Sequence, residues 1–145
     1  MQIEKFPIIS LILICISILV AVISGIGNNH DAISFLFISD LNINESYWPV
    51  NEPWRFVTPI FIHFGLQHIV FNSVAIWELG KICEPKKGIF SFIVFILIIS
   101  IISNTLQYLI DGRPNFGGLS GLVYGIFGYL WIKGLRDDEY KLSKE

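Results

Sequence analysis

The sequence predicts an all-α membrane protein, a bundle of four transmembrane helices in a single domain over residues 1–145. The composition is the first observation: 53% of the 145 residues are apolar and 15% are charged, whereas soluble domains are about 45–50% apolar and about 25% charged. The mean hydropathy of +0.63 is the second, and it excludes an intrinsically disordered chain. The third is that charges gather between apolar runs of about 20 residues, the length that crosses a bilayer.

The first predicted span covers residues 6–26. A cleaved signal peptide is the alternative, but this apolar run exceeds the usual 7–15-residue core, and the preceding segment has only Lys5 beside Glu4. Residues 27–56 follow as a long outer loop. Because this loop is acidic and rich in aromatic residues, we expect it to lie against or partly in the membrane.

The other predicted spans cover residues 57–79, 89–110 and 116–132, and residues 135–145 form a polar tail. The positive-inside rule places both termini in the cytoplasm. With that orientation, only Arg55 and Arg113 fall outside, and eight basic residues fall inside: Lys5, Lys81, Lys86, Lys87, Lys133, Arg136, Lys141 and Lys144.

Charge and metal-ligand patterns exclude two classes of function. The formal net charge of −2 gives no basic surface for nucleic acid. Cys15 and Cys83 form neither a disulfide framework nor a zinc pattern. In the span 57–79, His63 and His68 are about 140° apart on a helix, so they do not converge as metal ligands. We therefore expect no nucleic-acid partner and no metal site.

Polar residues at membrane depth are functional candidates, and the span 57–79 contains several of them. His68 and Asn72 are four residues apart, so they share one helix face. They could bond to neighbouring helices and hold the bundle together. Alternatively, two donors one turn apart could point into a cavity and stabilise an oxyanion. The residues alone leave both interpretations open.

The span 116–132 begins with a glycine-rich segment around Ser120. Ser120, Tyr124 and four glycines lie on one helix face (Gly117, Gly121, Gly125 and Gly128). This face could be a seam for close helix packing with an incidental serine. It could instead place a nucleophilic hydroxyl at a helix N-terminus, next to backbone donors that glycines leave uncovered.

Three linked motifs therefore stand in order: a Trp-Arg pair, a helix with histidines and an asparagine, and a Gly-Leu-Ser-Gly helix start followed by a tyrosine. Their order and internal spacing resemble the rhomboid family of intramembrane serine proteases. The likeness covers about residues 54–136, and Glu84 falls where many members carry an acid. It implies a rhomboid-like bundle with four of an expected six transmembrane helices, and no cofactor.

The resemblance implies a role for each matching residue. Ser120 would be the nucleophile, and the oxyanion hole would consist of His68, Asn72, the Gly118 turn and the Ser120 backbone N–H. The supporting residues would be Tyr124, which stacks on the catalytic histidine, Trp54 and Arg55, which anchor the outer loop, and His63, which is structural. The reaction would be hydrolysis of a peptide bond in or next to a substrate's transmembrane helix.

The resemblance also implies a general base that the sequence does not contain. Rhomboids carry it as a histidine on a sixth span, whereas the histidines here are His30, His63 and His68. We therefore expect a domain that is incomplete at its C-terminus, inactive alone, with no partner helix for its glycine face. The expected partners are the lipid bilayer, transmembrane protein substrates and a second polypeptide that supplies the missing helices. A non-catalytic protein that binds transmembrane segments is the alternative.

Overall fold

A computed structural model describes residues 6–39, 48–137 and 140, and this part of the chain is helical with no strand. Four α-helices alternate in direction, and three short 3₁₀ helices lie between the first two. In chain order the elements are α1 (Ile8–Ile23), η1 (Asp31–Leu36), η2 (Pro53–Phe56), η3 (Thr58–Phe61), α2 (Leu66–Lys87), α3 (Ile89–Asp111) and α4 (Ser120–Gly134).

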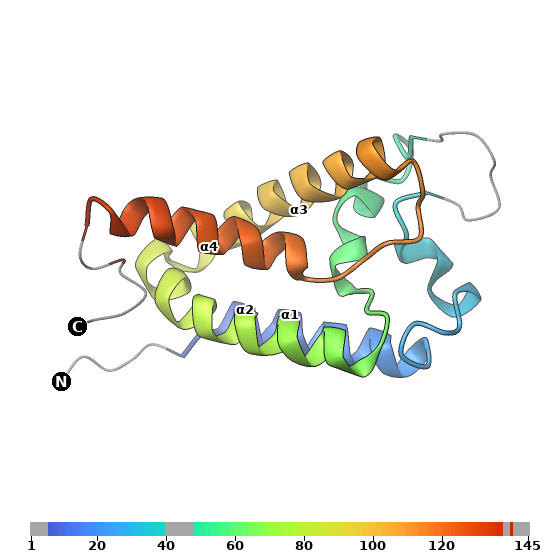
Figure 1. Ribbon diagram of the computed structural model, residues 1–145, viewed down its shortest axis with the longest axis horizontal. Helices are drawn as coiled ribbons and strands as arrows, with labels where there is room; N and C mark the ends of the chain where they lie inside the picture. The colour runs from blue at the N-terminus through green and yellow to red at the C-terminus, as the bar shows by residue number, and fades with distance from the viewer. Residues whose placement is uncertain (1–5, 40–47, 138–139, 141–145) are drawn as a thin grey trace.

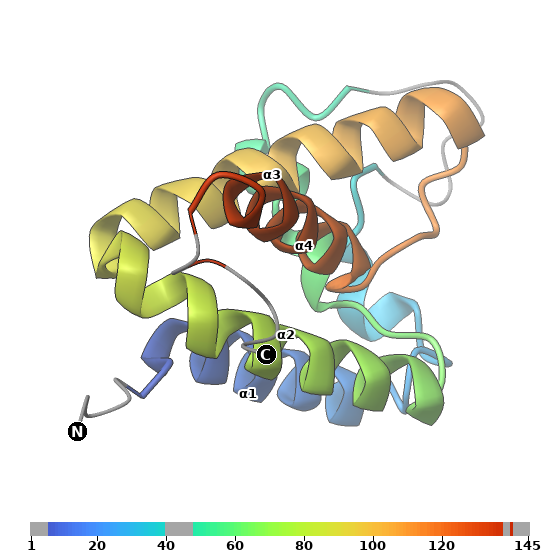
Figure 2. The same ribbon diagram turned by 60° about the vertical axis from the view of Figure 1, so that its left-hand side comes forward.

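The helices form two layers. Helices α1 and α2 pack along each other in one layer, and α3 and α4 form the other layer. Helix α4 contacts both α2 and α3 (Figures 1 and 2). All three 3₁₀ helices gather at the end of the bundle where α2 and α4 begin (Figure 1). The start of α1 and the end of α4 both lie at the opposite end (Figure 1). The beginnings of α2 and α4 are thus brought together beside the 3₁₀ helices.

Two of the predicted helix starts are wrong. The second helix begins at Leu66 rather than at residue 57. Pro53 and Pro59 stand in the first turns of η2 and η3, and Gly65 adopts φ +98°, a conformation that excludes a continuous helix. The fourth helix begins at Ser120 rather than at residue 116. The first and third helices lie within about three residues of their predicted bounds.

The expectation that the glycine face of α4 has no partner is also wrong. A Cβ built on Gly121 would lie 2.5 Å from Ser103 Oγ, and one built on Gly125 would lie 2.6 Å from Ile99 Cγ2. Both glycines therefore let α4 approach α3 closely. Of the glycines on this face, only Gly128 has open space around it, so the part of the face that stays uncovered lies further along α4.

Helix α3 is long and apolar enough to cross a bilayer, and it is the one such helix in the described part of the chain. Helix α1 is apolar but shorter, with 16 residues. Most of the predicted outer loop lies in the described residues, whereas residues 40–47 and most of the predicted tail lie outside them.

Candidate active site

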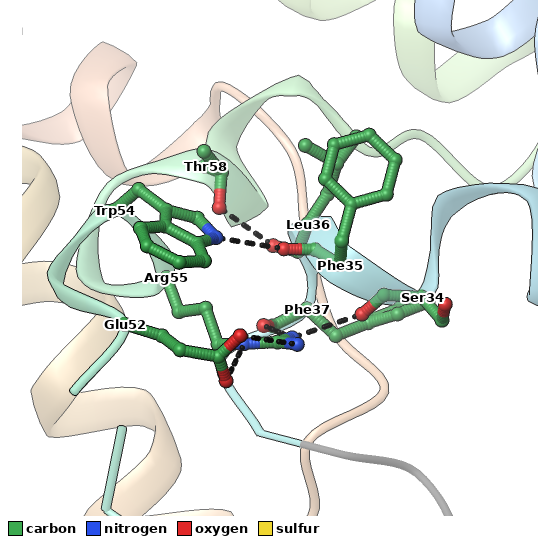
Figure 3. A network of polar contacts seen from close by, with 8 residues as sticks. All are labelled: Ser34, Phe35, Leu36, Phe37, Glu52, Trp54, Arg55 and Thr58. Atoms are coloured by element: carbon green, nitrogen blue, oxygen red, sulfur yellow. Dashed lines mark hydrogen bonds and ion pairs between the residues drawn. The ribbon is translucent and has the colours of Figure 1, made fainter. Parts of the chain in front are cut away.

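The site is supported by a loop that the Arg55 side chain fastens to η1. Arg55 Nη1 donates to the carbonyl oxygens of Ser34 (2.9 Å) and Phe37 (2.8 Å), and Arg55 Nε donates to Glu52 (2.8 Å) (Figure 3). The Arg55 side chain is 11% exposed. Its charge is therefore neutralised by a carboxylate and by carbonyl dipoles, as a buried cation requires.

Trp54 and Thr58 complete this attachment. Trp54 Nε1 donates to the Phe35 carbonyl (3.2 Å), and Thr58 Oγ1 donates to the Leu36 carbonyl (2.9 Å) (Figure 3). Four consecutive carbonyls at the end of η1 thus accept bonds from residues 54–58. The indole of Trp54 remains 47% exposed. The outer loop is therefore rigidly joined to the segment that leads into α2.

Further hydrogen bonds connect this loop to α3 and to the segment that precedes α4. Asn104 Nδ2, from α3, donates to the carbonyls of Phe56 (2.9 Å) and Val57 (3.4 Å). The Gly118 N–H donates to the Pro59 carbonyl at 3.0 Å. The sequence patterns did not single out Asn104, although an amide inside an apolar helix is a recognisable signal.

His63 is fully buried just before α2, where it contacts α4. Its Nδ1 lies 3.2 Å from the Phe61 carbonyl, so this nitrogen must carry the proton. Its Nε2 then accepts the Leu119 N–H at 3.5 Å. The two contacts define one neutral tautomer, in which His63 holds the residue before Ser120.

The expectation that His63 and His68 diverge is wrong. It assumed one continuous helix, whereas His63 precedes α2 in a non-helical segment. The two rings are 5.0 Å apart between centroids and tilted by 58°. No group of three or more potential metal ligands occurs among the described residues.

Ser120, at the start of α4, meets His68 and Asn72 from the first two turns of α2. Ser120 Oγ lies 3.3 Å from His68 Nε2 and donates to Asn72 Oδ1 at 3.2 Å. The serine proton therefore faces an amide oxygen, which is not a base. His68 Nε2 can donate to Ser120 Oγ in the tautomer that protonates this nitrogen.

Two side-chain groups that can donate hydrogen bonds lie close to Gly118. Gly118 adopts φ +121°, and a Cβ built on it would lie 2.7 Å from His68 Nε2 and 3.4 Å from Asn72 Nδ2. Asn72 Nδ2 is buried and has no partner. Ser120 is the first residue of α4, where backbone N–H groups lack helical acceptors. The donors therefore surround a position that suits a small anionic oxygen.

Tyr124 stands apart from this cluster. It lies one turn beyond Ser120, on a side of α4 that α2 and α3 leave uncovered, and it is 75% exposed. One turn further, a Cβ built on Gly128 would meet no atom within 4 Å. The uncovered face therefore runs from Tyr124 to Gly128 and begins one turn beyond the serine.

Comparison with known proteins agrees with the motifs. A family model described as the Rhomboid domain matches residues 50–143. Proteins named Rhomboid protease GlpG from Salmonella newport, Salmonella heidelberg and Salmonella schwarzengrund are 42% identical to this chain over 97 residues. The aligned region covers 63% of this chain and 35% of each relative, so the chain matches about a third of the length of these curated relatives.

Proposed function

The chain belongs to the rhomboid family, and on this premise we propose that it forms part of an intramembrane serine endopeptidase with Ser120 as the nucleophile. Its substrates are transmembrane proteins, which it cleaves in or next to their membrane helices. The observation that carries the proposal is the group of donors around Gly118. Asn72 Nδ2 is buried without a partner, and such a group costs about 1–3 kcal/mol unless it acquires an acceptor, here the oxygen of a bound substrate.

All four α-helices cross the membrane in this proposal. Each exposes large apolar side chains, among them Leu19, Phe71, Phe90 and Trp131, which are all more than half exposed. Large exposed apolar surfaces are unfavourable in water. The 15 residues of α4 extend about 22 Å, less than the hydrocarbon thickness of about 30 Å. If α4 ends at the inner surface of the hydrocarbon layer, Ser120 lies inside that layer, below its outer surface.

The orientation follows from the basic residues at one end of the bundle. Lys86 and Lys87 stand in the last turn of α2, and Lys133 stands in the last turn of α4. These ends lie where α1 begins (Figure 1). The positive-inside rule assigns that end to the cytoplasm, so the 3₁₀ helices and the Ser120 site face the outer half of the bilayer.

Catalysis would proceed by attack of Ser120 Oγ on the substrate carbonyl carbon while a general base takes the serine proton. The base would then return this proton to the amine that leaves when the peptide C–N bond breaks, and water would release the acyl group from Ser120. The developing oxyanion would accept hydrogen bonds from His68 Nε2, Asn72 Nδ2 and the Ser120 backbone N–H. Removal of one such donor typically costs about 10²–10³-fold in rate. The hydrogen bonds of His63 and Pro59 to the 118–119 backbone keep these donors in place before the substrate arrives. No cofactor takes part.

The general base comes from outside the three histidines of this sequence. We place it on a further helix that packs on the Tyr124–Gly128 face of α4, from the same polypeptide beyond residue 145 or from a second polypeptide. The open space at Gly128 allows close helix approach. Residues 1–145 would then be one incomplete rhomboid domain.

A second candidate is a rhomboid-like protein that binds transmembrane segments without cutting them. The observation that favours it is the Ser120 proton, which is directed at Asn72 Oδ1 rather than at a base. This protein would use the same recessed site between α2 and α4 for binding alone.

A cleavage assay separates the two candidates. The chain is co-expressed with the C-terminal helices of one of the Salmonella relatives and a reporter that carries a single transmembrane helix. We expect cleavage that Ser120→Ala abolishes while reporter capture persists. Capture without cleavage in the unmodified assembly would favour the binding protein.

A further inference from the structure

Three lysines and three aromatic rings form a cluster at the end of the bundle opposite Ser120. Lys87 Nζ lies 4.2 Å from the centroid of the Phe95 ring and 4.0 Å from that of Tyr129. Lys86 and Lys133 both lie over the Tyr140 ring, at 4.2 and 5.6 Å. We call these six residues the lysine–aromatic cluster. The rings hold ammonium groups from two helices near one another.

Carboxylates do not neutralise these ammonium groups within the described residues. The ion pairs recorded there are Arg55–Glu52 and Lys81–Glu78. Glu84 lies one turn before the lysines, but both of its oxygens accept bonds from Ile9 and Ser10 of α1. Among the described residues, Asp137 also lies within electrostatic reach of the Tyr140 hydroxyl, so at least one carboxylate stands near the three ammonium groups. Like charges held this close repel one another unless an anion joins them.

An apolar stripe of α3 leads away from the cluster. Helix α3 begins two residues after Lys87, and four large side chains one turn apart on it face outward. They lie on the same side of α3 as Phe95, and their exposed fractions are 51% for Ile98, 53% for Ile102, 51% for Leu106 and 60% for Leu109. The spacing places them on one face of the helix. A cationic group at the base of a long apolar stripe matches a molecule with an anionic head and hydrocarbon chains.

We propose that the lysine–aromatic cluster binds the phosphate headgroup of an anionic phospholipid whose acyl chains lie along the exposed stripe of α3. The ring faces leave the outer N–H groups of each ammonium free to donate to phosphate oxygens. Basic pockets between helices at the cytoplasmic surface have this capacity. The proposal rests on the proposed membrane insertion, and it is independent of the catalytic roles of Ser120 and its neighbours.

The test is lipid-dependent thermal unfolding of the full chain, purified without lipid in an uncharged detergent. Phosphatidylglycerol and phosphatidylcholine with the same acyl chains are titrated separately. We expect phosphatidylglycerol to raise the midpoint of unfolding and phosphatidylcholine to leave it unchanged. Each ammonium removed should weaken the apparent affinity about fivefold, and removal of all three about a hundredfold.

Lys86→Gln, Lys87→Gln and Lys133→Gln are compared with Lys81→Gln, which removes a carboxylate-paired lysine from the same helix α2. The Lys81 variant should bind as the unmodified chain does, and the arginine versions of the three cluster lysines should retain binding. Equal weakening by Lys81→Gln, or equal protection by phosphatidylcholine or inorganic phosphate, would overturn the proposal. Ser120→Ala should bind the lipid normally, which separates this test from that of the protease.

Discussion

Glu84 joins the end of α2 to the start of α1. Its replacement by glutamine measures how much this attachment contributes to the free energy of unfolding. One carboxylate oxygen accepts the Ile9 N–H at 2.9 Å, and the other accepts the Ser10 N–H (3.1 Å) and the Ser10 hydroxyl (3.0 Å). Glu84 is 4% exposed. Both N–H groups belong to the first turn of α1, where helical acceptors are absent.

Glutamine keeps the shape of this side chain and replaces one acceptor oxygen by an amide nitrogen. At least one buried N–H then loses its partner, which costs about 1–3 kcal/mol, and the favourable charge at the helix N-terminus is lost, at about 0.3–1 kcal/mol. We expect Glu84→Gln to lower the free energy of unfolding by about 2–3 kcal/mol. Equilibrium unfolding in mixed micelles of sodium dodecyl sulfate and an uncharged detergent measures this change.

Glu78→Gln is the matched control, because Glu78 lies on the same helix and its side chain is 58% exposed where it pairs with Lys81. Exposed pairs of this kind contribute about 0.2–1 kcal/mol. If Glu84→Gln destabilised the protein no more than Glu78→Gln does, the attachment of α1 through Glu84 would be refuted.

Three further changes test other parts of the structure. Gly118→Ala should reduce Ser120-dependent cleavage by about 10²–10³-fold in the complemented assembly, since its Cβ would lie 2.7 Å from His68 Nε2 and 3.4 Å from Asn72 Nδ2. Unchanged cleavage would contradict the proposed oxyanion site. Asn104→Leu should lower the free energy of unfolding by about 1–3 kcal/mol, because the carbonyls of Phe56 and Val57 lose their donor. An unaltered unfolding curve would contradict this role of Asn104. Ile26 adopts the left-handed conformation with φ +57°, which asparagine tolerates better than a β-branched residue does. Ile26→Asn should therefore raise the free energy of unfolding by about 1 kcal/mol, as measured by thermal unfolding. A lower midpoint of unfolding would contradict backbone strain at Ile26.

Hydropathy was sufficient to predict the helices that are apolar throughout. It predicted the third helix almost to the residue, since Gly88 and Gly112 bound a mostly apolar run with no charged residue before Asp111. It failed at both ends of α2, where apolar residues before Leu66 form 3₁₀ turns and polar residues continue the helix to Lys87. The continuation depends on Glu84, whose partners on α1 are 74 and 75 residues away and leave no local signal.

In the site too, sequence patterns predicted what depends on local spacing and missed what depends on contacts between distant segments. The spacing of His68 and Asn72 placed them on one helix face, and the motif order singled out Ser120 as the candidate nucleophile. The proximity of His63 to His68 depends on the break at Gly65, and the packing of Gly121 on Ser103 depends on the path of α3. Neither contact is encoded in the periodicity of a single segment, so sequence patterns could not supply it.

Labelling of Ser120 by a fluorophosphonate tests the central claim most directly. The full chain is compared with Ser120→Ala, each alone and with a polypeptide that supplies the C-terminal helices of a rhomboid relative. We predict Ser120-dependent labelling only with the added helices, because a positioned base contributes about 10²–10⁴-fold and the serine proton otherwise faces Asn72 Oδ1. Equally fast labelling of the chain alone would contradict this account and would assign the base to His68, whose Nε2 lies 3.3 Å from Ser120 Oγ.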